Sequence, residues 1–298
     1  MSEAQTPLEE VWGDVWEHAR LLADIDRTRG LVDFLARNAP GRTVVEVGCG
    51  TGLLSCIAAR MGARSVIGIE PTRRHRDARR LAQASDLADR VEILHGRVQD
   101  LEPRPADLVF SELLNAEPFA EGIVQAMRAA RAWCLPDGLM APGRLDLHVC
   151  LVAAAQVEAE IVGAWDIVAE LGETYDLDVA PILESLEATP PRQFTASFVE
   201  RRSESVRAIS IPLGVPEDPP DQVEVELVAS QAGKVCGAAI WFSSPYDDKL
   251  TLANPPEDPG HWGIQVTGWT RPLRLAAGQA LRVRVELDPV RGVLVTPI

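Results

Sequence analysis

The 298-residue chain lacks the marks of several classes of protein. No apolar run reaches the roughly 18 residues that a membrane-spanning helix needs, so we expect no membrane segment. The acidic beginning lacks the charged and then apolar order of a signal peptide, so we expect no export. The five cysteines form neither a CxxC pair nor a metal-ligand spacing. Their pattern indicates a reducing compartment, and we expect a cytoplasmic protein without a bound metal.

Positive charge is scarce as well. There are 29 lysines and arginines against 44 acidic residues, which gives a formal net charge of −15. Because nucleic acids are polyanions, this imbalance argues against general nucleic-acid binding. A cationic substrate would be attracted, although solubility alone also explains an acidic surface. Apolar residues make up 46% of the chain, which is typical of a globular protein with a core.

The first half of the chain alternates short apolar runs with helical patterns. Each apolar run has the length of one buried strand. The runs are TVVEVGC (43–49), SVIGIE (65–70), VEILHG (91–96) and ADLVFSE (106–112). This alternation predicts a doubly wound, Rossmann-like α/β domain over residues 39–142. Helical spacing across residues 14–38 predicts that the N-terminal segment, 1–38, is helical.

The second half has a different pattern. From about Leu145 onward, apolar and polar residues alternate, and proline-rich turns separate the alternating runs. A period of two is typical of antiparallel strands with one buried face, so we expect a β-barrel-like domain over residues 143–298. Residues 157–188 interrupt the pattern, because they look partly helical and show no strand pairing.

A glycine-rich turn follows the first predicted strand and leads directly into a helix. It reads Glu46-Val-Gly48-Cys-Gly50-Thr-Gly52. Glycines let the backbone pass close to a ligand, and a helix N-terminus offers unpaired N–H groups. Glu70 ends the second predicted strand, where a carboxylate suits two ribose hydroxyls. Together these residues resemble motif I and its acidic partner in class I S-adenosylmethionine-dependent methyltransferases, although the spacing is not the GxGxxG dinucleotide fingerprint.

The segment SELLNAEPFAEG keeps two glutamates, Glu112 and Glu121, among mostly apolar residues. Their spacing of nine resembles the double-glutamate loop of the protein arginine methyltransferase family, and LPDGLMAPGRLDLHV follows it in the family's order. The resemblance implies that Arg27, in LLADIDRT, binds the carboxylate of the cofactor. It also implies that Val98 and Gln99, in HGRVQDL, lie at the adenine, although the family usually has a glutamate where Gln99 stands.

Near the end of the chain, EDPGHWGI resembles the Thr-His-Trp loop of the same family. His261 and Trp262 occupy the last two positions of that motif. Asp24 stands where the family has an aspartate that pairs with the loop histidine. The resemblance thus implies an Asp24–His261 pair that bridges the domains, and that either accepts a released proton or only clamps the domains together. Trp262 either walls the guanidinium pocket or belongs to the core, and His18 aligns with a histidine near the cofactor but is more simply structural.

The reaction of this family explains why two carboxylates would be kept. A guanidinium stays protonated and its lone pairs are delocalised, so it is a poor nucleophile. Glu112 and Glu121 would accept charge-assisted hydrogen bonds from it, fix the planar group and concentrate its positive charge on the bound half. Glu117, which lies between them, has no counterpart in the family and reads as a rim charge without a role.

We therefore expect an S-adenosyl-L-methionine-dependent arginine N-methyltransferase. Its cationic guanidino acceptor would be free L-arginine or arginine in a peptide or protein, with a natural-product pathway as one setting. Two alternatives stay open: methylation of another small amine or amidine, and a non-catalytic methyltransferase-like scaffold. Residues 157–188 would be the family's dimerisation arm, so a head-to-tail homodimer is expected. The tyrosine-rich N-terminal helix of the family cannot be recognised in this sequence. Trp12 and Trp16 are candidates to take the place of its tyrosines.

Overall fold

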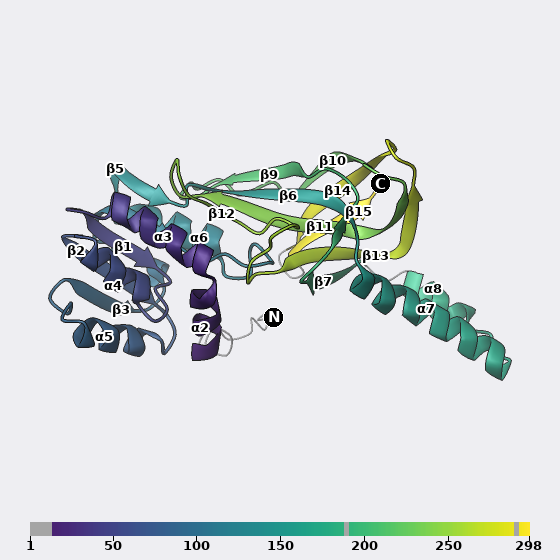
Figure 1. Ribbon diagram of the computed structural model, residues 1–298, viewed down its shortest axis with the longest axis horizontal. Helices are drawn as coiled ribbons and strands as arrows, with labels where there is room; N and C mark the ends of the chain where they lie inside the picture. Colours follow the sequence, from purple (N-terminus) through teal and green to yellow (C-terminus); the bar gives the residue numbers. More distant parts are fainter. Residues whose placement is uncertain (1–13, 188–190, 289–291) are drawn as a thin grey trace.

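The structure is a computed structural model that describes residues 14–187, 191–288 and 292–298. Two units with different sheets lie side by side, and a pair of helices projects from the far end of the second unit (Figure 1). Trp12, with the rest of residues 1–13, and residue 188 of the expected arm lie outside the described residues.

The first unit is a five-stranded parallel sheet with the strand order β3-β2-β1-β4-β5. Its strands are β1 (Thr43–Val47), β2 (Ser65–Glu70), β3 (Val91–His95), β4 (Ala106–Ser111) and β5 (Cys134–Ala141). The helical segments between them are α4 (Leu53–Arg60), α5 (His75–Ala84), η1 (Val98–Asp100), α6 (Ile123–Ala130) and η2 (Arg131–Trp133). The strand order reverses between β1 and β4, and ligands of doubly wound sheets bind at that point, beyond the carboxyl ends of the strands. The predicted Rossmann-like fold is confirmed.

The segment LPDG, residues 135–138, has residue types typical of a turn but lies inside strand β5. Cys134 and Leu139 both pair with β4, and the register shifts between Ala106 and Leu108 of that strand. Extra residues on one strand are accommodated as a bulge, so the local turn pattern does not end the strand.

The helical pattern over residues 14–38 forms two helices, α2 (Val15–Ala23) and α3 (Ile25–Asn38). Asp24 separates them, because its backbone is extended, with φ −72° and ψ 90°. Its carboxylate accepts a hydrogen bond from the backbone N–H of Arg27 at 3.1 Å, which caps the start of α3. The break turns α2 away from the axis of α3 (Figure 1).

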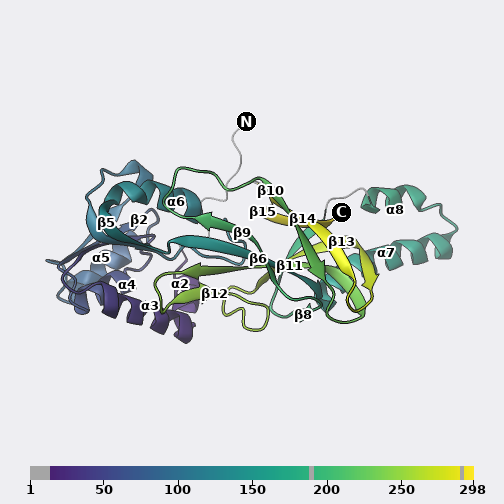
Figure 2. The same cartoon turned by 90° about the horizontal axis from the view of Figure 1, so that it is seen from above.

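The second unit contains two antiparallel sheets, as the alternating pattern predicts. The larger follows the path β7-β13-β11-β6-β8, with β12 on β11 and β9 on β6, and the smaller is β10-β14-β15. Its strands are β6 (Arg144–Ala153), β7 (Arg192–Ala196), β8 (Glu200–Arg201), β9 (Val206–Pro212), β10 (Gln222–Val228), β11 (Gly233–Pro245), β12 (Thr251–Ala253), β13 (Ile264–Leu275), β14 (Ala280–Asp288) and β15 (Gly292–Pro297). The long strands β6 and β11 run from the parallel sheet toward the far end of the molecule (Figure 2).

One continuous hydrophobic core joins the two units. Phe34 of α3 packs edge-on against Tyr246, which follows β11, with 5.5 Å between ring centroids, and also against Phe110 of β4. The buried hydroxyl of Tyr246 donates to the carbonyl oxygen of Ser111 at 2.6 Å. The second unit is therefore tied to the end of β4, where the double-glutamate loop begins.

The projecting arm consists of α7 (Ala155–Tyr175) and α8 (Ala180–Glu187), so this segment is helical over most of its length. The base of α7 packs directly on β13. A Cβ at Gly268 would lie 2.7 Å from Val157 Cγ1 and 2.8 Å from Ile161 Cδ1, so a larger residue there would force these side chains to shift. Farther along the arm, Ile167 and Leu171 are 57% and 48% exposed.

Candidate functional site

The glycine-rich turn lies between β1 and α4, at the carboxyl edge of the parallel sheet. Gly48, Gly50 and Gly52 all have positive φ, at 76°, 54° and 77°. A Cβ on Gly50 would lie 2.7 Å from His18 Cε1, so glycine lets the turn pass close against α2. The N–H of Gly50 donates to Glu70 Oε2 at 2.8 Å. The turn and the acid that ends β2 are therefore directly connected.

Glu70 is buried, and the protein fixes the orientation of its carboxylate. Oε1 accepts hydrogen bonds from the N–H of Thr72 at 2.8 Å and from the Thr72 hydroxyl at 2.6 Å. Among the described residues, Oε2 accepts one hydrogen bond, from the N–H of Gly50. Because a carboxylate oxygen can accept two hydrogen bonds, Oε2 keeps one position that suits a ligand hydroxyl.

Glu46 lies in β1 beneath the turn, and its side chain is buried. The hydroxyl of Ser55 in α4 donates to its Oε2. Burial raises the pKa of Glu46 to about 8, and the nearby charge of Glu70 adds to the rise. At neutral pH the Glu46 carboxyl is therefore mostly protonated in the cofactor-free protein.

We expect this buried acid to make the protein less stable at alkaline pH. The folded-state pKa of Glu46, about 8, lies above its ordinary value of 4.5, so folding favours the protonated form. The stabilisation is complete below pH 4.5 and is lost as the pH rises through 8, by about 1.4 kcal/mol per pH unit between those values. Thermal unfolding of the wild-type protein at pH 6 and at pH 9 measures this loss of stability. The Glu46→Gln variant should lose much less stability between pH 6 and pH 9. An equal loss in the wild type and the variant would contradict the raised pKa of Glu46.

Glu112 directly follows β4 and begins the double-glutamate loop. Its side chain is 8% exposed, and its Oε2 forms an ion pair with Nη2 of Arg27. Burial raises the pKa of Glu112, and the charge of Arg27 opposes that rise. The other oxygen, Oε1, is buried and has no hydrogen-bond partner among the described residues. A buried acceptor without a donor is costly, so Oε1 is suited to a donor from a ligand.

Glu121 lies at the other end of the loop, two residues before α6. Gly122, between them, is the N-cap of that helix and has a left-handed conformation, with φ 70°. The side-chain amide of Asn115 donates to Glu121 Oε1 at 3.2 Å. Burial raises the pKa of Glu121 well above its ordinary value, and the charge of Glu112 adds to the rise. The two carboxylates therefore share one poorly solvated region, in which a cation favours their joint ionisation.

The hydrogen bond predicted between Asp24 and His261 is present. His261 Nδ1 lies 2.8 Å from Asp24 Oδ2, and the backbone N–H of His261 donates to the same oxygen at 3.3 Å. Burial lowers the pKa of His261 more than the bond to Asp24 raises it, so the imidazole is held neutral. Because Asp24 accepts the proton on Nδ1, Nε2 is an acceptor, and it has no partner among the described residues.

Trp262 connects the second unit to the double-glutamate loop. Its Nε1 donates to the carbonyl oxygen of Leu114 at 2.9 Å, and its ring packs edge-on against Phe242 with 5.1 Å between centroids. The indole thus fixes the loop backbone two residues after Glu112.

The segment expected at the adenine lies at the same edge of the sheet. Val98 and Gln99 form part of η1, shortly after β3, whose last residue, His95, pairs in register with Glu70. Val98 is buried and Gln99 is exposed.

The ring of His95 stacks on the ring of His75, with 3.9 Å between their centroids. No group of three or more metal-ligating side chains occurs among the described residues.

The expectation that Glu117 is a rim charge is wrong. Its Oε1 is buried without a hydrogen-bond partner among the described residues, and a Cβ at Gly292 of β15 would lie 2.7 Å from it. Its Oε2 accepts a hydrogen bond from the N–H of Phe119 at 3.1 Å. Glu117 therefore packs against the second unit, because the loop runs across the junction between the units.

Two residues of the site are not found from the sequence. Asn115 lies inside the double-glutamate segment, but its type indicates no role there. Tyr246 binds Ser111 from 135 positions away, and no local pattern connects them. The available signals are weak: a polar amide between two apolar residues, and a tyrosine whose hydroxyl must find a partner if it is buried.

The residues present fit S-adenosylmethionine. Arg27 donates from Nη1 to the carbonyl of Leu21 at 3.2 Å and from Nη2 to Glu112, whereas its buried Nε has no acceptor among the described residues. An unpaired guanidinium donor near the glycine turn suits a carboxylate. The remaining acceptor capacity of Glu70 Oε2 suits a ribose hydroxyl, so Arg27 Nε and Glu70 Oε2 match the carboxylate and the ribose of that cofactor.

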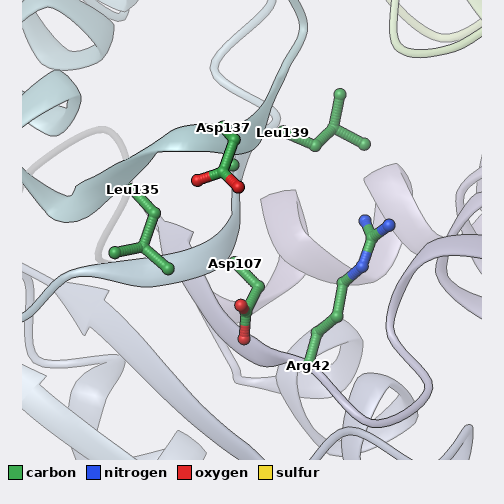
Figure 3. Close-up of a pocket in the computed structure, with 6 residues that line it drawn as sticks. Arg42, Asp107, Leu135, Asp137 and Leu139 are labelled. Carbon is green, nitrogen blue, oxygen red and sulfur yellow. The ribbon is translucent and has the colours of Figure 1, made fainter.

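A cavity of about 380 Å³ lies elsewhere, at the opposite edge of the sheet. Arg42, Asp107, Leu135, Asp137 and Leu139 surround it (Figure 3). Arg42 directly precedes β1, and Asp107 is the second residue of β4, so the cavity lies at the amino ends of the strands. Asp107 also accepts a hydrogen bond from the N–H of Thr43 at 2.7 Å, which makes it part of the sheet's support. The cavity is separate from the candidate site.

The parallel sheet, the glycine turn after β1 and the buried acid at the end of β2 define a class I S-adenosylmethionine-dependent methyltransferase. Comparison with known proteins agrees, because residues 44–138 match the family model described as a methyltransferase domain.

In the part of the chain that the structure describes, no helix is long and apolar enough to cross a membrane.

Several arginine methyltransferases are similar to this chain over nearly its whole length. The chain is 30% identical over 292 residues to arginine N(omega)-methyltransferase of Streptomyces achromogenes subsp. streptozoticus, covering 90% of this chain and 75% of that protein. It is 24% identical to protein arginine N-methyltransferase 1 of Schizosaccharomyces pombe, covering 92% and 82%. The enzyme–prozyme arginine methyltransferase complex of Trypanosoma brucei with AdoHcy superposes with a TM-score of 0.79 at 25% identity, covering 93% and 89%.

The chain belongs to the protein arginine methyltransferase family. It is therefore an S-adenosylmethionine-dependent arginine methyltransferase with the expected two-unit fold.

Proposed function

We propose that this enzyme methylates a guanidino nitrogen of free L-arginine, or of arginine in a peptide or protein, and that Glu112 and Glu121 clamp the guanidinium. The observation that carries the proposal is the pair of buried carboxylates beside the glycine turn. Each is held through one oxygen, Glu112 by Arg27 and Glu121 by Asn115. Oε1 of Glu112 is buried and has no donor among the described residues, and a guanidinium could donate to it and to Glu121 together.

The clamp acts on the charge distribution of the acceptor. Two carboxylates that accept from one guanidinium fix its plane and concentrate its positive charge on the bound nitrogens. The remaining nitrogen then has more lone-pair character. As this nitrogen bonds to the methyl carbon and the carbon–sulfur bond of the methyl donor breaks, its positive charge rises. Fixed negative charge at Glu112 and Glu121 therefore stabilises the transition state more than the ground state. Trp262 would wall the same pocket.

S-adenosylmethionine supplies, when bound, a methyl group on an electrophilic sulfonium sulfur. We propose that Arg27 binds its carboxylate through Nε and that Glu70 binds its ribose. Glu46 would support the turn from below, because its bond to Ser55 ties β1 to α4. The full proposed cofactor set is Arg27, Glu46, Gly48, Gly50, Gly52, Glu70, Val98 and Gln99.

The acceptor nitrogen must lose a proton once it carries the methyl group. Nε2 of His261 is a neutral base without a partner among the described residues, and Asp24 fixes its tautomer through Nδ1. The bond from the His261 backbone N–H to Asp24 equally supports a clamp between α2–α3 and the second unit. We propose both roles for this pair.

The range of acceptors follows from the relatives and the surface charge. One relative is named for arginine itself and others for protein arginine. The net charge of −15 favours cationic acceptors of either size. We rank free L-arginine first, which would place the enzyme in a small-molecule or natural-product pathway.

Mass spectrometry tests the function directly. Purified enzyme and S-adenosylmethionine are incubated with free L-arginine and, separately, with an arginine-containing peptide, and Glu112→Gln and Glu121→Gln serve as controls. A gain of about 14 daltons (one CH₂ net) on free arginine, absent in both variants, supports the free-arginine proposal. A gain on the peptide alone moves the acceptor to peptides or proteins. No gain on either, with cofactor bound, contradicts the proposal.

We also propose that the enzyme is a head-to-tail homodimer joined by the arm. Residues 155–187 carry nine acidic residues and no lysine or arginine. Their exposed apolar side chains include Ile167, Leu171, Tyr175, Leu177 and Ile182. Such a surface suits a partner that is both apolar and basic, and α5 of a second copy offers exposed Arg76 and Arg80.

Replacing Ile167 and Leu171 together by aspartate is expected to convert the dimer to a monomer. Two charges in the centre of an apolar contact remove its buried area and leave unpaired carboxylates there. Sedimentation velocity at micromolar concentration measures the change, and Thr174→Ala on the exposed arm is the matched control. A wild-type protein that is already monomeric, or a double variant that stays dimeric, would exclude this interface.

A further inference from the structure

We propose that Asn115 is a positioning residue for Glu121: its side-chain amide holds one oxygen of the second clamp glutamate and so directs the other oxygen to the substrate. This inference rests on the proposed clamp and deepens it. Asn115 is a residue to which neither the resemblance nor the chemistry of the clamp assigns a part.

The geometry of the loop supports this assignment. Asn115 Nδ2 donates to Glu121 Oε1 at 3.2 Å, and both side chains are half-buried. The neighbours of Asn115, Leu114 and Ala116, are buried, at 2% and 3% exposure. The carbonyl of Leu114 also accepts the bond from Trp262 Nε1. The amide therefore extends from a stretch of backbone that is fixed on both sides.

The charge balance of the site explains why this donor is neutral. Glu112 is paired with the cation Arg27, whereas the one donor to Glu121 among the described side chains is an amide. With both glutamates ionised, Glu112, Arg27 and Glu121 sum to one net negative charge, which matches one guanidinium. A lysine or arginine in place of Asn115 would neutralise the site before the substrate arrives. An amide fixes the carboxylate without removing its charge.

Three substitutions at Asn115 separate this role from loop packing. Asn115→Asp keeps the shape but replaces the Nδ2 donor by an oxygen. Asn115→Ala removes the donor without adding charge, and Asn115→Gln keeps an amide on a longer stem. The readouts are kcat and KM across pH 6 to 10 with the acceptor found by mass spectrometry, the affinity for S-adenosylhomocysteine and the unfolding temperature.

We expect Asn115→Ala to lower kcat/KM by about 10- to 100-fold, the range for one hydrogen bond to a charged group. Asn115→Asp should lose more, and Asn115→Gln should recover part of the activity. The acid limb of the kcat/KM profile should move upward by about one pH unit in Asn115→Ala, because a donor to Glu121 stabilises its ionised form. Affinity for S-adenosylhomocysteine should not change, since Asn115 does not contact the proposed cofactor groups.

A double-mutant cycle with Glu121→Gln completes the test. If Asn115 acts through Glu121, Asn115→Ala adds little to the loss caused by Glu121→Gln. A full additional loss, an unmoved acid limb, or wild-type kinetics in Asn115→Ala would each overturn the positioning role while leaving the clamp in place. Full activity in Glu121→Gln alone would instead overturn the clamp, and with it this inference.

Discussion

Glu112→Gln and Glu121→Gln are each expected to lower kcat by about 10²- to 10³-fold, the usual effect of removing one well-placed group that stabilises a transition-state charge. Glutamine is nearly isosteric with glutamate but is neutral, and its amide nitrogen cannot accept from a guanidinium. Glu121→Gln removes a carboxylate that forms no ion pair among the described residues and receives one hydrogen bond there, from the neutral amide of Asn115. Glu112→Gln also leaves the guanidinium of Arg27 buried without its anion, so we expect this variant to be the less stable of the two.

Glu117→Gln is the matched control for both variants. It lies in the same loop, is half-buried and changes the same functional group, but it accepts from Phe119 and packs against β15 rather than joining the clamp. Its kcat should stay near the wild-type value. Steady-state kinetics at saturating cofactor, with unfolding temperature and S-adenosylhomocysteine affinity measured in parallel, separates lost chemistry from lost folding. A loss in Glu117→Gln as large as in the clamp variants would contradict the two-glutamate assignment.

The same residues predict the pH dependence of the reaction. Burial raises the pKa of Glu121 well above its ordinary value, and only the ionised carboxylate can accept from a guanidinium through both of its oxygens. The value of kcat/KM should therefore fall as the pH decreases, with a midpoint above the ordinary glutamate pKa of 4.5. Glu121→Gln should flatten this limb.

Local patterns were sufficient for the overall fold. Strands β1 to β4 are short apolar runs in the order that parallel sheets require, and the alternation along β6, β10 and β14 marks antiparallel strands. The local patterns failed at the break between α2 and α3, where a single residue interrupts the helical periodicity. Apolar positions continue at helical spacing from Leu21 to Ile25, yet Asp24 between them ends one helix and caps the next. A cap is a hydrogen bond made by one side chain, which periodicity does not record.

The site residues were suggested by resemblance, but their partners were not. Arg27 was expected at the cofactor, and it also pairs with Glu112, 85 positions away. Tyr246 reaches Ser111 across the junction of the two units, and Asn115 reaches Glu121 within one loop. Such contacts depend on how the loop after β4 folds against α3 and the second unit. Sequence spacing predicts where a carboxylate lies along the chain, whereas burial and partners, which set its pKa, depend on the tertiary fold.

Arg27→Leu is expected to lower the free energy of unfolding by about 3–5 kcal/mol, because it leaves Glu112 as an unpaired buried charge. It should also weaken S-adenosylhomocysteine binding by about 10- to 100-fold, since the guanidinium Nε is the proposed donor to the cofactor carboxylate. Chemical denaturation measures the first effect, and calorimetric titration measures the second.

The double variant Arg27→Leu/Glu112→Gln distinguishes these two effects. Neutralising Glu112 removes the unpaired charge, so most of the lost stability should return, whereas cofactor affinity should stay low because the donor is still missing. If the double variant is as unstable as Arg27→Leu, the packing of Arg27 against α2 outweighs its ion pair. If cofactor affinity returns with stability, Arg27 organises the loop and does not bind the cofactor. Stability without affinity would show that one guanidinium serves both halves of the site, with Nη2 on the clamp and Nε on the methyl donor.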